Sequence, residues 1–207
     1  MFNIYNNRGP YSLKELQALK QYIREYIGPV SDVLPSFADR KLSVSVAVIP
    51  PAPQREYYTL LTIGMGVHRM KTPKGIPNRL ELAIRLPAQW DLDSIRESCF
   101  WPIRWLQILA RMPLNQRTWF RHGHTVDACR HLVGDSGFHG FALHCFREDM
   151  PLLTLSKHKE LGILTLIPVY FEELALAKLA STEELFDRLG EAVVYGPVNL
   201  SRKNICD

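Results

Sequence analysis

Three consecutive segments with β-strand patterns constrain the fold more than any other feature of this chain. Residues 42–49 (LSVSVAVI) alternate so that Leu42, Val44, Val46 and Val48 share one face, and the segment stops at two prolines. Residues 57–64 (YYTLLTIG) combine aromatic and β-branched side chains, and residues 79–87 (RLELAIRLP) place their leucines and isoleucine on one face. Because turn-rich loops join the three segments, the pattern predicts an antiparallel meander.

Two other patterns predict helices. Ser12 and Glu15 form a capping box, in which each side chain satisfies an amide of the first helical turn. Apolar residues at helical spacing follow as far as Gly28-Pro29. A second, largely buried helix is predicted to begin near Trp101-Pro102 and to end at Pro113.

The C-terminal half adds both kinds of element. Residues 138–146 and 161–167 are predicted strands, a helix is predicted to begin at Pro168, and Ser181 with Glu184 opens the last helix. The chain is therefore expected to be an α+β protein, with a central mixed or mostly antiparallel sheet and helices packed on it.

The composition argues against several classes of function. With 207 residues and 46% hydrophobic side chains the chain can bury a full core, and its net charge of +4 is spread without a dense basic run, so nucleic-acid binding is not expected. The longest apolar run, residues 163–171, is about half of a membrane span, and the N-terminus does not resemble a secretory signal. A cytoplasmic protein with no membrane partner is expected. The four cysteines lack a C-x-x-C pair, which predicts free thiols.

Gly64-Met65-Gly66 resembles part of a dinucleotide-binding fingerprint. The third glycine is missing, and the residues that follow are loop-like and not helical. The better interpretation is a turn that leaves a buried strand, with glycines for backbone freedom.

Residues 122–131 (HGHTVDACRH) bring three imidazoles and a thiol close together in the sequence. Such groups bind zinc, so a metal-dependent enzyme with ligands His122, His124, Cys129 and His131 is one hypothesis. The paired spacing of most zinc sites is absent, however, and a polar loop with turn and capping roles is the alternative.

Several sequence blocks, in this order, resemble the suppressor of fused domain family in its bacterial form: TLLTIGMGVHRM, ELAIRLPAQW, FWPIRWLQILARMP, TWFRHGHT, LIPVYFEELALAK and RKNIC. The resemblance covers residues 44–206. It implies one α+β domain over residues 1–207, in which residues 1–40 are an N-terminal helical extension and residues 41–207 are the family core.

The resemblance also implies a function. Animal members of the family bind a short segment of a zinc-finger transcription factor as an added strand, and bacterial members have been proposed as immunity proteins against toxins. A non-enzymatic protein-binding domain is therefore expected, without catalytic residues or a cofactor. Its partner would be a protein or peptide, with a toxin as one candidate, and a regulatory adaptor that sequesters a protein factor is the alternative.

Four residues are expected at the surface as contacts for that partner: Arg85, Trp90, Trp101 and His124. Tryptophan and arginine often anchor protein interfaces, and Trp90 and Trp101 lie near the ends of predicted elements. The polar loop of residues 121–137 and an exposed edge of the sheet are the regions where contact is expected.

Overall fold

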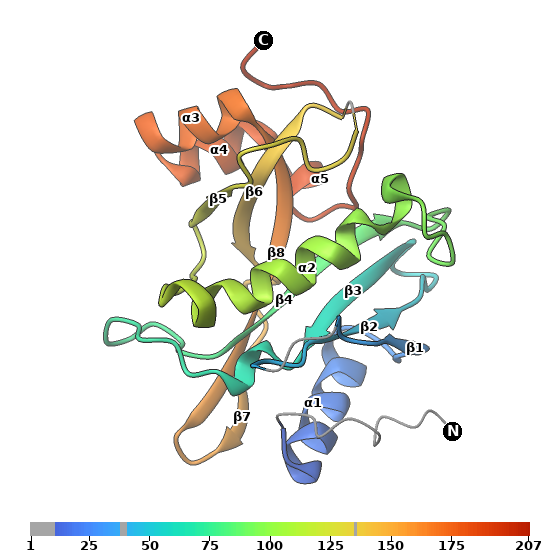
Figure 1. The fold of residues 1–207 in the computed structure, drawn as a ribbon, viewed down its shortest axis with the longest axis vertical. Helices are drawn as coiled ribbons and strands as arrows, with labels where there is room; N and C mark the ends of the chain where they lie inside the picture. Colours follow the sequence, from blue (N-terminus) through green and yellow to red (C-terminus); the bar gives the residue numbers. More distant parts are fainter. Residues whose placement is uncertain (1–10, 38–40, 135) are drawn as a thin grey trace.

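The fold is built on one eight-stranded sheet with helices on both faces (Figure 1). The computed structural model describes residues 11–37, 41–134 and 136–207. The strands are β1 (Asp32–Leu34), β2 (Ser45–Ile49), β3 (Tyr57–Ile63), β4 (Leu80–Pro87), β5 (Thr125–Asp127), β6 (Phe138–Cys145), β7 (Leu153–Ser156) and β8 (Lys159–Tyr170). The helices are α1 (Leu13–Tyr26), the 3₁₀ turn η1 (Met65–Val67), α2 (Glu97–Gln116), α3 (Phe171–Leu179), α4 (Thr182–Leu189) and α5 (Glu191–Val194).

The strands lie in the order β1-β2-β3-β4-β8-β6-β5, and β7 forms a hairpin with β8. The predicted meander is confirmed, since β2, β3 and β4 pair antiparallel. Strands β4 and β8 pair parallel, and the other neighbours are antiparallel. The sheet is therefore mixed and the α+β class is confirmed. Strand β1 was not predicted, so the segment before residue 40 contributes a sheet edge as well as a helix.

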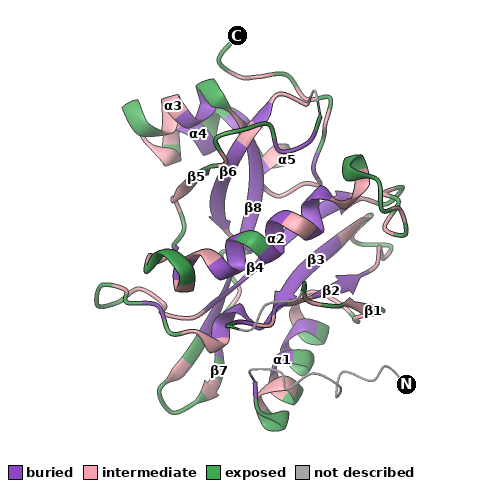
Figure 2. Ribbon diagram, viewed as in Figure 1, coloured by how far each residue is buried: buried purple, intermediate pink, exposed green. Residues whose placement is uncertain are grey.

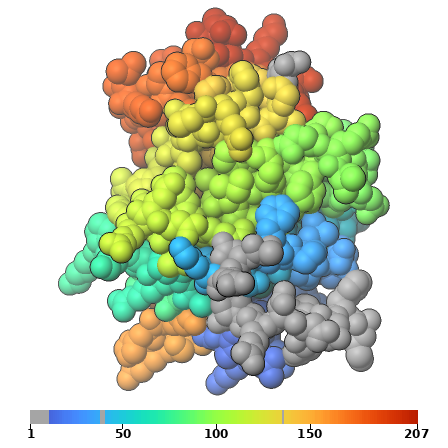
Figure 3. Space-filling model, viewed as in Figure 1, coloured from blue at the N-terminus to red at the C-terminus, as the bar shows by residue number. Residues whose placement is uncertain are grey.

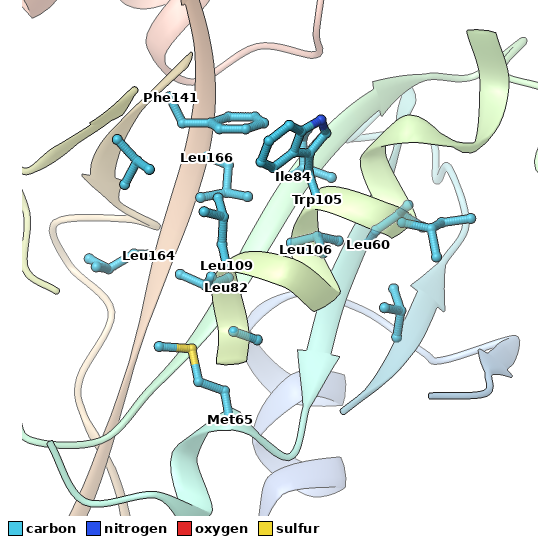
Figure 4. Packing of buried hydrophobic residues seen from close by; sticks show 14 of the residues in the cluster. Leu60, Met65, Leu82, Ile84, Trp105, Leu106, Leu109, Phe141, Leu164 and Leu166 are labelled. Atoms are coloured by element: carbon cyan, nitrogen blue, oxygen red, sulfur yellow. The ribbon is translucent and has the colours of Figure 1, made fainter. Parts of the chain in front are cut away.

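One face of the sheet packs against α2. The leucines and isoleucine of β4 and alternate residues of β8 meet α2 there, as Leu82, Leu106 and Leu109 show in Figure 4. The Trp105 ring lies 5.7 Å from that of Phe141 on β6, in an edge-on arrangement. In Figure 2 the buried residues of α2, in purple, lie across central strands that are also mostly purple.

The predicted limits of α2 were wrong at both ends. The helix begins at Glu97, four residues before Trp101, and continues through Pro113 to Gln116. Arg117 caps the C-terminal end of the helix in a left-handed conformation with φ of 55°. Proline usually ends or bends a helix. Pro113 is itself buried, and only three helical residues follow it, of which Asn115 and Gln116 are exposed. The missing N–H of Pro113 therefore removes one hydrogen bond close to the end of the helix.

The opposite face carries two groups of helices. Helix α1 packs on residues of β2, β3 and β4 that alternate with those facing α2, among them Ala47, Leu61 and Ala83. Helices α3, α4 and α5 pack on β6 and β8 at the other end of this face. Between the two groups lie buried polar side chains, including Thr59, Arg85, His144 and Thr165.

Strand β8 extends beyond its prediction, and Pro168 lies inside it instead of starting α3. Pro168 is opposite Phe141 of β6, while the pairing with β4 has already ended at Thr165. A residue without an N–H is tolerated there because no ladder bond requires one. Its carbonyl oxygen accepts a hydrogen bond of 3.0 Å from Arg202.

The glycines after β3 surround a carboxylate of the chain itself. The amides of Gly64 and Gly66 donate to Glu81 Oε1 at 2.9 and 3.1 Å, and the Met65 amide donates to Oε2 at 3.3 Å. The Thr62 hydroxyl also donates to Oε2. Glu81 has no exposed surface, so the turn is part of the core.

Candidate functional site

A groove of about 700 Å³ lies on the surface at the end of β4. Its walls come from Glu56 just before β3, the turn after β4, the first turn of α2 and the C-terminal segment. The lining residues are Glu56, Pro87, Ala88, Gln89, Trp90, Asp91, Ser98, Cys99, Pro197, Val198, Asn199, Leu200 and Ser201. Four stretches of the chain thus form this groove, and the last of them, residues 197–201, is about 100 residues or more from the others. We call this set of residues the Trp90 groove.

Trp90 is half-buried in the wall of this groove. Its Nε1 donates a hydrogen bond of 2.9 Å to the carbonyl oxygen of Cys99, and its ring lies edge-on to Trp101 at 6.2 Å. These contacts fix one part of the indole and leave another part accessible. The expected surface position of Trp90 therefore fits the structure.

Trp101 and Arg85 do not occupy surface positions, and this part of the prediction was wrong. Trp101 has no exposed surface because α2 begins before it, which places it on the buried side of the helix, 6.4 Å from Phe141. Arg85 is 3% exposed. It lies on the face of β4 opposite the leucines, and that face is covered by other parts of the chain.

His124 is half-buried, directly before β5, and its ring packs on Trp119 with centroids 4.7 Å apart. Burial, together with the nearby Arg121, lowers the pKa of His124. In the space-filling view the loop that holds these residues, in yellow-green and yellow, covers the surface above α2 (Figure 3). The participation of His124 in partner binding stays a prediction.

The structure does not gather the four predicted metal ligands. His131 lies beside His139, with rings 5.2 Å apart, whereas His124 packs on Trp119 and Cys129 is exposed. Residues 125–127 form the extended strand β5, and an extended strand separates residues that are close in sequence. The predicted set His122, His124, Cys129 and His131 is therefore not a metal site.

Only His122 of that set joins a different cluster, with His144 and Cys145 of β6. The potential ligand atoms of these residues lie within 4.8 Å of one another. The amide of Cys145 donates to His122 Nδ1 at 3.1 Å, and His144 Nδ1 lies 2.8 Å from the carbonyl oxygen of Cys145.

Burial lowers the pKa of both histidines and raises the pKa of the Cys145 thiol. A metal ion would require the thiolate and would displace the backbone partner of His122. In the structure, the hydrogen bond between the Cys145 amide and His122 attaches the loop before β5 to β6.

Comparison with known proteins decides the family. The sequence profile described as Suppressor of fused protein (SUFU) matches residues 40–203. The chain belongs to the suppressor of fused family. No curated protein has significant sequence similarity to it.

Solved structures share the suppressor of fused fold. A chain of the Sufu–Fu complex has a TM-score of 0.67 and 14% identity, with 96% of this chain and 93% of that chain covered. A suppressor of fused homologue from Neisseria gonorrhoeae has a TM-score of 0.63 and 18% identity, with 94% and 96% covered. Drosophila Suppressor of Fused has a TM-score of 0.65 and 12% identity, and the match covers 92% of this chain but only 50% of that chain. At these identities the likeness establishes the fold.

One feature of this suppressor of fused domain was missed in the sequence. Arg202 and Glu173 form a buried ion pair whose side chains are 7% and 0% exposed. Arg202 Nη1 lies 2.6 Å from Glu173 Oε1, and the Ile205 amide donates to the same oxygen at 3.2 Å. The pair fixes the C-terminal segment directly after the residues that line the Trp90 groove. Its only sequence signal is that both residues lie in blocks that resemble the family.

The sheet of this suppressor of fused domain has two outer strands that could take an added strand. Strands β1 and β5, with three residues each, are the outermost strands of the main path. Edge strands present backbone groups that a bound peptide can pair with. Among the described residues, no helix is both long and apolar enough to cross a membrane.

Proposed function

We propose that this chain is a non-enzymatic protein-binding domain and that its partner contacts the Trp90 groove. The observation that carries the proposal is the half-buried Trp90 in the wall of an open groove of about 700 Å³. Tryptophan is among the residues that supply most binding energy at protein interfaces, because it combines a large apolar area with a polar N–H.

The distribution of polar and apolar residues in the groove favours a protein partner. Exposed polar residues, among them Glu56, Gln89 and Asn199, surround the partly exposed Trp90. An apolar centre with a polar rim is typical of protein interfaces. The Arg202–Glu173 pair and the Trp90–Cys99 hydrogen bond hold two of the walls in place. A wall that is already ordered loses less conformational entropy when a partner binds.

The specific role that we propose is that of a cytoplasmic immunity protein, whose partner is a toxin. The resemblance to the bacterial form of the family supports this role, and the structure of a family member in the Sufu–Fu complex supports a protein as the class of partner. A regulatory adaptor that sequesters a protein factor would use the same physics and differs only in its partner. The enzyme hypothesis is not retained because its predicted ligands lie apart.

The first experiment identifies the partner. Tagged protein would be used for a pull-down from its own cells in about 0.15 M salt, which screens nonspecific charge contacts, followed by mass spectrometry. A single near-stoichiometric protein is expected. If its expression alone stops growth and coexpression of this chain restores growth, the immunity role is supported. A partner without toxicity would favour the adaptor instead.

The second experiment locates the contact. Gln89→Arg and Asn199→Arg add bulk and charge to exposed positions of the groove, and Gln17→Arg adds the same group to the exposed side of α1. With the partner from the pull-down, calorimetry is expected to show at least tenfold weaker binding for the two groove variants and unchanged binding for Gln17→Arg. Equal affinities for all three variants would rule out the groove.

A further inference from the structure

Arg85 is a buried cation without an anionic partner. Its Nη2 donates to the carbonyl oxygen of Phe146 at 2.7 Å, and its Nη1 donates to that of Val194 at 3.3 Å. Its guanidinium also lies 4.6 Å from the centre of the Phe146 ring. No carboxylate of the described residues lies within ion-pairing distance of it. Arg202, in contrast, is buried together with Glu173. Buried charges are normally paired, so Arg85 is an exception to be explained.

Arg85 lines a cavity of about 130 Å³. The cavity lies where the parallel strands β4 and β8 stop pairing after Ala83 and Thr165, and the segment after α5 closes it. The Val198 amide of that segment donates to the Arg85 carbonyl oxygen at 2.9 Å. A gap beyond the carboxyl ends of adjacent parallel strands is a frequent place for ligands.

Two polar groups of the cavity lining have no partner among the described residues. They are Arg85 Nε and Thr165 Oγ1, and both residues are 3% exposed. Most buried polar groups in proteins have a hydrogen-bond partner. An arginine Nε–H can only donate, and a hydroxyl can also donate. Both unpaired groups can therefore bind an acceptor, and the positive charge of Arg85 favours an anionic one.

The rest of the lining is mainly apolar, with Ile167, Val193, Val194 and Val198 among its residues. A phosphate dianion needs several donors, whereas a carboxylate is satisfied by a guanidinium and a hydroxyl and can carry an apolar chain. The volume of about 130 Å³ is comparable to that of about four liquid waters, at roughly 30 Å³ each. That is enough for a short acid.

We propose that this cavity binds a small monocarboxylate with a short aliphatic chain. The carboxylate accepts hydrogen bonds from Arg85 Nε–H and from the Thr165 hydroxyl, and the chain contacts Ile167 and the valines. The cavity shares Pro197, Val198 and Asn199 with the Trp90 groove, but Arg85 and Thr165, the groups proposed to bind the carboxylate, do not line the groove. The proposal therefore does not depend on the protein contact.

The test uses butyrate as the probe and the full chain without its partner. Calorimetry at constant ionic strength is expected to show saturable one-to-one binding of butyrate and no binding of inorganic phosphate. Arg85→Met is expected to weaken butyrate binding at least tenfold. The control variant Arg188→Met, on the exposed surface of α4, is expected to bind as the wild type does.

Thr165→Val keeps the test valid if Arg85→Met does not fold. It removes an unpaired hydroxyl and keeps the shape, so its melting temperature without ligand is expected to be equal or higher, while its butyrate affinity falls at least threefold. Absence of butyrate binding, binding of phosphate alone, or unchanged butyrate affinity in Thr165→Val would each overturn the proposal.

Discussion

The hydroxyl of Tyr11 donates a hydrogen bond of 2.7 Å to the carboxylate of Glu81, which has no exposed surface. Burial raises the pKa of Glu81, and the hydrogen bonds from Thr62, Tyr11 and the glycine amides oppose this rise. The turn that resembles part of a nucleotide-binding loop does surround an acidic side chain, but this side chain belongs to β4. Glu81 thereby connects the start of α1, the end of β3 and β4.

Removing the Tyr11 hydroxyl is expected to weaken this connection. Tyr11→Phe should lower the free energy of unfolding by about 1–3 kcal/mol, because a buried carboxylate loses one of its donors. Tyr26→Phe is the matched control, since Tyr26 is only half-buried and its ring packs on Tyr22. Urea denaturation of both variants measures the difference. Equal stabilities would show that the contact contributes nothing.

Gly66 is predicted to tolerate no side chain. A Cβ at this position would lie 2.1 Å from Leu161 Cδ1 and 2.3 Å from the Tyr11 hydroxyl. Gly66→Ala should therefore destabilise the fold by about 1–3 kcal/mol through overpacking. Gly75 has φ of +86° but no atom within 4 Å of its Cβ position, so Gly75→Ala tests backbone strain alone. We expect the smaller loss for Gly75→Ala, about 1 kcal/mol, and the reverse order in thermal unfolding would contradict the packing argument.

The ion pair of Arg202 and Glu173 is expected to be critical for stability. Arg202→Ala should cost about 3–5 kcal/mol, because it leaves the Glu173 carboxylate buried and without its partner. Arg188→Ala breaks a pair with Glu184 whose side chains are 51% and 43% exposed. That loss should be about 0.5 kcal/mol or less. Chemical denaturation that gave similar losses for both variants would argue against a role for burial.

The histidine pair predicts a dependence of stability on pH. Burial lowers the pKa of both His122 and His144 below their ordinary value of 6.5. The unfolded chain therefore binds these protons at a higher pH than the folded chain does. The contribution of the two neutral imidazoles is fully present above pH 6.5 and is lost as the pH falls from 6.5 through their folded-state pKa values.

Urea denaturation between pH 7.5 and pH 5 checks this prediction. His144→Gln should show a smaller loss of stability over this range than the wild type, because one of the two groups no longer titrates. Charged neighbours such as Glu148 and Arg85 are present in both proteins, so the difference isolates the imidazole. An identical loss in both would exclude His144 as a source of the pH dependence.

The local signals in the sequence were sufficient for most of the architecture. The Ser12–Glu15 capping box forms as predicted, because its partners lie three residues apart and need no other part of the chain. The meander follows from alternation and turn residues, which are also local. The limits of α2 and the start of α3 could not be found in the same way, because the effect of a proline depends on the element around it. Pro113 lies three residues before the end of α2, and Pro168 lies in β8 beyond the part that pairs with β4.

The alternation of side chains along β4 is enough to place Arg85 on the face opposite its leucines. The burial of this face follows from the packing of distant segments, because the groups that meet Arg85 come from Phe146 and from Val194, 61 and 109 residues later in the chain. The same holds for His122 beside His144, for Arg202 beside Glu173 and for the C-terminal segment beside Trp90. Secondary structure depends on neighbours in sequence, whereas a site depends on which distant segments the packing of the core brings together.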